Sequence, residues 1–281
     1  MILPVRVLVT GATGCVGSAV AAWFAREGND VRALVRGEER LAGIEVVRGE
    51  ITDRAAVDVA ARGIDLAIHC AAAVSAELAA CRRVNVDGAR TLVEALARSG
   101  SARLVYVSTV SVYDDAAGPD FDEDSALWTT PESAYGFTKA EAERLIRASG
   151  VDAVILRPAL ILSLHARSRW GPLAVDRARV AAECLVPFRE LPYVHVDNLV
   201  DAIDLAAKAP AARGGVFNVV DGAADTREYL AAIYGAAGRE APPLPPDAPR
   251  VRFEAARLRR ALGWSPRDRW SDFITAIRRR P

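Results

Sequence analysis

The feature that most constrains this chain is a short apolar run leading directly into three closely spaced glycines. Residues 5–10 are rich in valine, which is typical of a strand buried on both faces of a parallel sheet. Gly11, Gly14 and Gly17 follow, and residues 18–26 have helical spacing and strong helix formers. A strand, a glycine turn and a helix N-terminus in this order form an anion site. The unpaired N–H groups of the first helical turn point at a phosphate, and the helix dipole favours its charge.

The three glycines suit a dinucleotide because each omits a side chain where a close approach is needed. Gly11 can make the tight turn, Gly14 lets a pyrophosphate touch the backbone, and Gly17 lets helix and strand pack closely. Three glycines alone could also form a surface turn, but the strand before them and the helix after them favour the phosphate site. The sequence therefore predicts a dinucleotide held by Gly11, Thr13, Gly14, Cys15, Val16 and Gly17.

Length and composition indicate a folded protein and give no sign of a nucleic-acid or membrane partner. The 281 residues are 51% hydrophobic, enough for one domain, or for one domain and a lobe. The 36 basic residues balance 36 acidic ones, so neither a nucleic acid nor a membrane surface is indicated as a partner. No run is long enough to span a bilayer, and the N-terminal apolar run is too short and broken for a signal peptide. The four cysteines lack metal-ligand spacing and disulfide density, which predicts reduced thiols, no metal and a cytoplasmic location.

The choice between NADP and NAD depends on the end of the second predicted strand, residues 30–35. In doubly wound nucleotide-binding folds, the residue at this tip meets the adenosine ribose. An acid there binds the 2′-hydroxyl of NAD, whereas an arginine suits the extra phosphate of NADP. The tip here is Arg36, with Arg40 just beyond it, so NADP is favoured. Glu38 and Glu39 could instead reach the ribose of NAD, and Arg36 could be only a solvated strand end.

Three further apolar runs, residues 44–47, 64–69 and 104–109, complete five predicted strand-then-helix units. Such a series forms an α/β fold, a doubly wound parallel sheet with helices on both faces. Ligands bind beyond the carboxyl ends of the strands in these sheets. The predicted site residues at this edge, besides the glycine loop, are Arg36, Glu50, Ile51, Ala71, Ala72, Ala73 and Thr109.

Two polar residues near this edge are predicted to have structural partners. Asn85 lies within a long helical stretch, residues 77–99, and because asparagine is a poor helix former we expect it to have a hydrogen-bonding role. His69, at the end of the fourth strand, is predicted to be structural rather than catalytic.

Tyr135 and Lys139 stand one turn apart on a predicted helix, residues 133–147. A phenol with its ordinary pKa near 10 is a poor proton shuttle at neutral pH, but a nearby ammonium, helped by an oxidised nicotinamide, lowers that pKa. The chain has only two lysines among 36 basic residues, so a lysine at this position is informative. An exposed tyrosine and a solvated lysine on an amphipathic helix remain the alternative.

Taken together, the glycine loop, Thr109 after the fifth strand and the Tyr135–Lys139 pair resemble the extended short-chain dehydrogenase/reductases, the NAD(P)-dependent epimerase/dehydratase group. The resemblance covers almost the whole chain, with further markers at residues 68–72, 85–88, 107–113, 156–158, 194–198, 217–219 and 262–264. It implies a Rossmann-type domain, residues 1–158, and a smaller C-terminal lobe, residues 159–281, that mainly binds substrate and returns some segments to the Rossmann core. It also implies a homodimer.

The resemblance also implies a role for each site residue. Tyr135 would be the general acid/base, Lys139 would hold the nicotinamide ribose and tune Tyr135, and Thr109 would hydrogen-bond the reacting oxygen. Ser108, its neighbour, should point the other way. The cofactor-binding residues implied in addition are Asn85, Val107, Tyr135, Lys139 and Pro158, with Glu50 and Ile51 at the adenine edge.

The C-terminal lobe departs from the nucleotide-sugar enzymes of this group. The segment after Pro158 lacks their asparagine and aromatic-glycine pair, and Leu191 stands where they tend to carry an arginine. Arg189 is two residues out of register with that position. The lobe instead offers apolar residues that could line a pocket or simply form its core: Leu164, Trp170, Leu173, Phe188 and Tyr193.

These features predict an NADP-preferring reductase or dehydrogenase that moves a hydride between the nicotinamide and a carbonyl or secondary alcohol of a small, partly apolar substrate. One alternative is a nucleotide-sugar epimerase or dehydratase that holds NAD tightly. Another is a non-catalytic, cofactor-sensing protein of the same fold. Intact Tyr135, Lys139 and Thr109 favour an enzyme.

Overall fold

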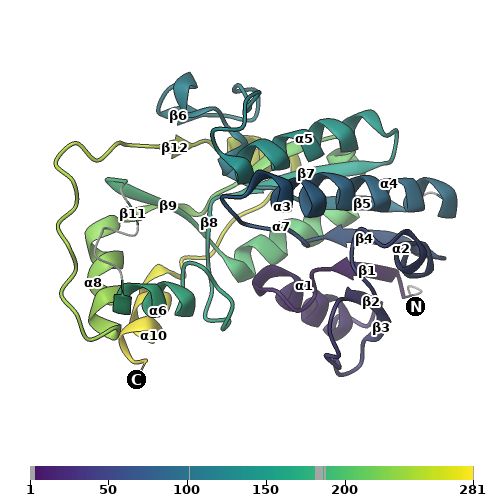
Figure 1. The fold of residues 1–281 in the computed structure, drawn as a ribbon, viewed down its shortest axis with the longest axis horizontal. Coiled ribbons are helices and arrows are strands. Elements are labelled where there is room, and N and C mark those ends of the chain that lie inside the picture. The colour runs from purple at the N-terminus through teal and green to yellow at the C-terminus, as the bar shows by residue number, and fades with distance from the viewer. Residues whose placement is uncertain (1–3, 101, 181–185, 187, 281) are drawn as a thin grey trace.

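The computed structural model describes residues 4–100, 102–180, 186 and 188–280. Its main feature is a parallel sheet of seven strands in the order β10-β7-β5-β4-β1-β2-β3 (Figure 1). Strand order reverses direction at β1, which is the arrangement expected of a doubly wound sheet. The strands are β1 (Arg6–Thr10), β2 (Asp30–Val35), β3 (Glu45–Arg48), β4 (Leu66–His69), β5 (Arg103–Val107), β7 (Ala153–Pro158) and β10 (Val216–Val219).

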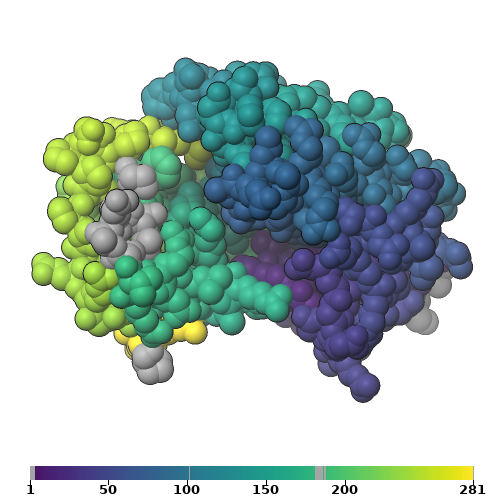
Figure 2. Space-filling model, viewed as in Figure 1, coloured from purple at the N-terminus to yellow at the C-terminus, as the bar shows by residue number. Residues whose placement is uncertain are grey.

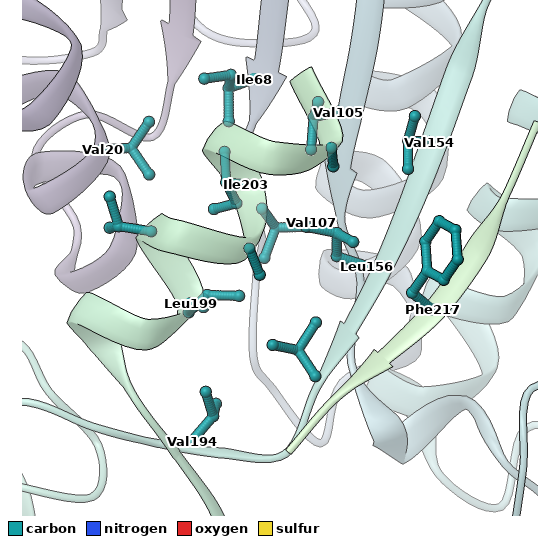
Figure 3. Packing of buried hydrophobic residues seen from close by; sticks show 14 of the residues in the cluster. Val20, Ile68, Val105, Val107, Val154, Leu156, Val194, Leu199, Ile203 and Phe217 are labelled. Atoms are coloured by element: carbon teal, nitrogen blue, oxygen red, sulfur yellow. The ribbon is translucent and has the colours of Figure 1, made fainter. Parts of the chain in front are cut away.

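Helices cover both faces of this sheet, so its strands are apolar on both sides. On one face, α1 (Cys15–Arg26) and α7 (Val196–Lys208) pack on Val7, Val105 and Leu156 (Figure 3). On the other face, residues that alternate with these along the strands, such as Leu8, Leu104 and Ile155, meet three helices. Those helices are α2 (Arg54–Ala61), α4 (Gly88–Ser99) and α5 (Ala134–Ala148). The predicted α/β doubly wound class is confirmed.

One part of the predicted strand–helix series is wrong. Between β2 and β3, residues 36–44 form turns and bends and no helix, because this connection is short, polar and ends near a glycine with φ of +71°. The fourth strand starts at Leu66 rather than at residue 64. The fifth ends at Val107, since the Thr109 side chain accepts the Ser111 N–H and caps a 3₁₀ turn, Val110–Val112.

The predicted helix over residues 77–99 is continuous but irregular in the middle. It runs as α3 (Leu78–Arg82), a π-helical turn (Arg83–Asp87) and α4. The extra residue of a π turn re-aims side chains, and such turns are frequent at functional sites. Asn85 lies within this turn, which points its side chain away from the helix toward the end of β4.

The C-terminal part builds a second sheet and core beside the first (Figure 1). Strands β8 (Leu160–Leu162), β9 (Glu190–His195) and β11 (Gly222–Asp225) form this sheet. Helices α6 (Pro172–Val180), α8 (Thr226–Ala236) and α10 (Trp270–Arg278) pack on it around Leu191, Tyr229 and Phe273. We call this part, without α7 and β10, the C-terminal lobe.

Some elements of the second half return to the first sheet. β10 pairs with β7 at its edge, and α9 (Ala256–Leu262) packs near β10. A small two-stranded sheet joins β6 (Asp120–Phe121) to β12 (Arg252–Phe253). Two further 3₁₀ turns are Asp115–Ala117 and Pro210–Ala212. Among the described residues, no helix has both the length and the apolar character that a membrane crossing requires.

Candidate active site and cofactor groove

The glycine loop between β1 and α1 is closely packed around its backbone. Gly11 has φ of +70°, and a Cβ there would come within 2.7 Å of the Ala71 nitrogen. A Cβ on Gly17 would lie 2.2 Å from the Gly11 carbonyl oxygen, so the helix could not approach the strand. No side chain caps α1 at Gly14, which leaves the N–H groups of its first turn available for a phosphate. These features fit the pyrophosphate of a dinucleotide.

A cavity of about 290 Å³ extends from this loop along the carboxyl ends of β2, β3 and β4. Its lining includes most of the cofactor residues predicted from the sequence: Gly11, Thr13, Gly14, Arg36, Glu50, Ile51, Ala71, Ala72 and Ala73. We call this cavity the adenosine groove. Its dimensions and its place at the switch point of the sheet suit the adenosine half of a dinucleotide.

The charged residues of the adenosine groove bear on the choice of cofactor. Glu38 pairs with Arg48 at 2.8 Å, and Glu39 faces Arg167 at 3.8 Å, so both glutamates already have cationic partners. Arg36 is exposed and forms no ion pair within the described part of the chain. Glu50 is also engaged, because its carboxylate accepts a hydrogen bond from Arg83 at 2.8 Å.

Asn85 hydrogen-bonds Ala73, a residue that lines the adenosine groove. Its Oδ1 accepts the Ala73 N–H at 2.8 Å, and its Nδ2 donates to the Ala73 carbonyl at 3.0 Å and to Thr138 Oγ1 at 3.1 Å. The predicted hydrogen-bonding role is therefore found. Asn85 does not line the cavities that hold the other predicted residues, so its contribution is to hold Ala73 in place.

A second cavity, of about 780 Å³, lies between the sheet edge and the C-terminal lobe, and we call it the substrate cavity. It joins Thr109, Tyr135 and Pro158 with Cys15 and Val16 of the glycine loop. A hollow is visible there in Figure 2, between the N-terminal segments in purple and the lobe in green. Thr109, Tyr135 and Pro158 thus face one space, whereas Lys139, the third residue predicted to catalyse, does not line it.

Lys139 lies on α5, and its side chain is directed toward the end of β5. It is buried, its Nζ donates to the Val107 carbonyl at 2.8 Å, and it lies 4.0 Å from the ring centroid of Tyr106. Val107, a predicted cofactor residue, therefore contributes its backbone carbonyl, which accepts this hydrogen bond from Lys139. Ser108 points the other way, as predicted, and its hydroxyl donates to Glu143 at 2.5 Å.

The pKa values of Tyr135 and Lys139 differ from the sequence-based expectation. Burial raises the pKa of Tyr135 to about 12, and a hydrogen bond with Thr109 opposes this shift. Burial lowers the pKa of Lys139 to about 7, against the attraction of Glu143. Desolvation therefore outweighs any help that Lys139 gives the Tyr135 phenolate, because the ammonium is directed at Val107.

A buried ion pair beneath the site was not predicted from the sequence. Arg157 Nη2 lies 2.6 Å from Glu143 Oε2, with both side chains almost fully buried. Arg157 Nη1 also donates to the Tyr113 hydroxyl at 3.0 Å. Glu143 lies four residues after Lys139 on α5, and this spacing is the one signal that could have pointed to it. The pair fixes α5, which carries Tyr135, to β7, which carries Pro158.

A second unpredicted residue, Arg167, links the lobe to the glycine loop. Its Nη1 donates to the Thr13 carbonyl and lies 3.3 Å from Thr13 Oγ1, and it contributes to both cavities. The two residues are 154 positions apart, so no local pattern could have shown the contact.

The remaining predictions have mixed outcomes. His69 is structural, because its Nδ1 lies 2.6 Å from Thr10 Oγ1 and burial lowers its pKa to about 3. Of the five apolar lobe residues, Trp170 and Phe188 line the substrate cavity. Leu164 and Leu173 are exposed instead. Tyr193 packs in the core of the lobe, where its ring centroid lies 5.1 Å from that of Trp270.

Comparison with known proteins places the chain in a family. A sequence model of the NAD-dependent epimerase/dehydratase family matches residues 7–219, which is most of the Rossmann-type sheet and its helices. The chain belongs to this family. It is an enzyme of the extended short-chain dehydrogenase/reductase type, as predicted.

Individual family members resemble the chain over most of its length. A 4-hydroxy-2-methyl-3-oxo-4-farnesyl-3,4-dihydroquinoline-1-oxide ketoreductase of Stigmatella aurantiaca is 30% identical, over 92% of this chain and 80% of that protein. A UDP-glucose 4-epimerase of Azospirillum brasilense is 28% identical, over 93% of this chain and 87% of that protein. A solved structure of a short-chain dehydrogenase/reductase superfamily protein from Agrobacterium tumefaciens, with bound NAD, has a TM-score of 0.79 and 27% identity. It covers 97% of this chain and 96% of that one. Reductases and epimerases are thus both among the relatives.

Proposed function

We propose that this epimerase/dehydratase family member is an NADP-preferring reductase or dehydrogenase of a carbonyl or secondary alcohol on a small, partly apolar molecule. The observation that carries the proposal is the substrate cavity, in which Thr109 and Tyr135 face apolar residues of the lobe, Trp170 and Phe188 among them. The cavity reaches the glycine loop through Cys15. It can therefore hold a substrate against both a cofactor and a proton donor.

The dinucleotide would be held by the glycine loop, the adenosine groove and the Lys139–Pro158 end of the site. When bound, it would supply the hydride that a carbonyl carbon accepts in reduction, or take one from an alcohol carbon in the reverse direction. The unpaired guanidinium of Arg36, beside two glutamates that already have partners, supports NADP over NAD.

Tyr135 and Thr109 would handle the reacting oxygen. The Tyr135 phenol gives its proton to the carbonyl oxygen as that oxygen gains charge, and the Thr109 hydroxyl hydrogen-bonds the same oxygen. The phenolate left on Tyr135 then takes a proton from solvent, so one proton is consumed for each carbonyl reduced to an alcohol. A pKa near 12 in the cofactor-free site keeps Tyr135 protonated and ready to donate at neutral pH.

The lobe supports a reductase over a nucleotide-sugar enzyme. Leu191, at the position where those enzymes tend to carry an arginine, is fully buried in the core of the lobe, and Arg189 uses its backbone N–H on Pro249. Neither Leu191 nor Arg189 is among the described residues that line the substrate cavity. A homodimer and a cytoplasmic location remain predictions.

The deciding experiment is NADPH absorbance with a panel of ketones, aldehydes and UDP- or dTDP-sugars. Steady loss of NADPH with carbonyl compounds would support the proposed reductase. Sugar interconversion without NADPH loss would overturn it in favour of an epimerase. Cofactor binding with neither reaction would favour a non-catalytic sensor.

A further inference from the structure

The charged side chains that line the substrate cavity differ in whether they have hydrogen-bond or ion-pair partners. Glu132 accepts a hydrogen bond from Thr130, which lowers its pKa, and Arg167 is held by Thr13 at the rim. Arg169 makes no hydrogen bond or ion pair with any residue that the structure describes. Its guanidinium carbon lies 5.9 Å from the ring centroid of Trp170, the next residue in the chain. Arg169 is therefore an exposed arginine at the cavity whose N–H groups are open to a ligand there.

A second arginine lies behind Arg169. Arg177 on α6 has a buried Nη1 with no hydrogen-bond partner among the described residues. Burial and the charge of Arg177 both lower the pKa of Arg169, so the two guanidinium groups are close enough to repel each other. An anion that approaches Arg169 would reduce this repulsion and accept hydrogen bonds from its N–H groups.

Arg169 also shares the substrate cavity with Tyr135, the proposed proton donor. Arg169 and Tyr135 line the same cavity, and each affects the charge state of the other. A molecule whose carbonyl meets Tyr135 can therefore place another group at Arg169. Because guanidinium groups bind carboxylate and phosphate with paired N–H donors, that group should be an oxyanion.

We propose that the substrate cavity contains an anion subsite, formed by Arg169 and backed by Arg177, which binds a carboxylate or phosphate group of the carbonyl substrate. This inference rests on the proposed reductase function and narrows its substrate class to oxo acids or carbonyl phosphates with an apolar remainder. The apolar part would lie against Trp170 and Phe188. A nucleoside diphosphate could supply the same kind of charge, and the test separates that source.

The test compares matched substrates that differ only in charge. NADPH consumption is measured with 2-, 3- and 4-oxooctanoate and with their methyl esters. We expect at least one acid to have a KM about 10-fold or more below that of its ester, which corresponds to one charge-assisted interaction. Arg169→Gln should raise the KM for that acid about 10-fold or more and leave the KM for the ester unchanged, whereas Arg169→Lys should lie between.

Arg179→Gln is the matched control, because Arg179 lies nearby on α6, is exposed and pairs with Asp176. It removes one charge from the lobe without touching the cavity, and its KM values should equal those of the wild type. A binding readout that needs no turnover is calorimetric titration of octanoate. Its Kd should weaken about 10-fold in Arg169→Gln and remain unchanged in Arg179→Gln.

The outcomes separate this inference from the proposed function. Reduction of esters and acids with equal KM would overturn the anion subsite and leave the reductase intact. No reduction of either, with octanoate binding still dependent on Arg169, would overturn the reductase and keep the subsite. Binding of UDP that depends on Arg169, without binding of octanoate, would overturn the oxo-acid assignment and identify a nucleoside diphosphate as the anion.

Discussion

Tyr135 is half-buried and Lys139 is fully buried, and desolvation moves their pKa values in opposite directions. The phenol becomes harder to ionise and the ammonium easier to deprotonate, because a low-dielectric site disfavours either charge. Glu143, and to a smaller extent Cys70, raise the pKa of Lys139 against this effect. Proton chemistry at this site therefore depends on few charges, each of which can be removed by substitution.

Tyr135→Phe removes the proton donor with little change of shape. We expect turnover to fall about 10²- to 10⁴-fold, as for the loss of a general acid, while cofactor affinity stays nearly intact. Steady-state kinetics with any accepted carbonyl substrate, together with titration of NADPH, measures both quantities. A mild effect on kcat would remove Tyr135 from its assigned role.

Arg36→Asp tests the preference for NADP. The substitution replaces a free guanidinium with a repelling carboxylate, so we expect NADPH to bind about 100-fold more weakly and NADH to be little affected. Fluorescence titration of both reduced cofactors gives the two Kd values. Arg250→Asp, the same charge change on an exposed loop, is the control. Equal losses for NADPH and NADH would mean that Arg36 does not bind the phosphate.

Lys139→Met should stabilise the cofactor-free protein in a pH-dependent way. The pKa of Lys139 falls from 10.5 to about 7 on folding, so below pH 7 both states hold the proton and the full burial penalty applies. Between about pH 7 and 10.5 the unfolded state binds more protons, and wild-type stability rises with pH. The advantage of the variant should thus be largest below pH 7 and shrink toward pH 10.5, as followed by urea unfolding. A difference that is constant with pH would contradict the depressed pKa.

At the scale of elements, α5 is held to β7 by the Arg157–Glu143 pair, and to the segment after β4 through Thr138 and Asn85. These anchors fix the helix that carries the proton donor. The sequence predicted the helix and placed Tyr135 and Lys139 on one face of it, but it did not predict the partners of its polar residues. Such partners come from strands far along the chain, and their identity depends on packing that no local pattern contains.

Glu143→Gln tests the anchor. The amide keeps the shape but leaves the Arg157 guanidinium buried without its counter-charge, so we expect a loss of about 3–5 kcal/mol in the free energy of unfolding. Glu141→Gln is a matched control two residues away, since its partner Arg82 is half-exposed and the loss should stay below about 1 kcal/mol. If both variants lost the same amount in urea unfolding, the buried pair would not be the anchor.

At the scale of the whole molecule, the sequence predicted the sheet and its ligand edge better than the relation between the lobe and the glycine loop. The glycine loop and the strand ends follow from local patterns, so the adenosine groove could be outlined in advance. Arg167 and Arg169 could not be assigned, because their positions depend on how the β8–α6 connection crosses to Thr13 and Tyr135. The missing helix between β2 and β3 shows the same limit, since a parallel connection can also be made by turns alone.

The last strand of the main sheet, β10, has a consequence for biosynthesis. It is synthesised about sixty residues after β7, the strand with which it pairs. Helix α7, which covers one face of the sheet, lies between them in the chain. Until then β7 is an unpaired apolar edge, which is prone to pair with another nascent chain. A chain cut at residue 158 keeps the whole glycine loop and Tyr135, yet we expect it to aggregate rather than to bind nucleotide.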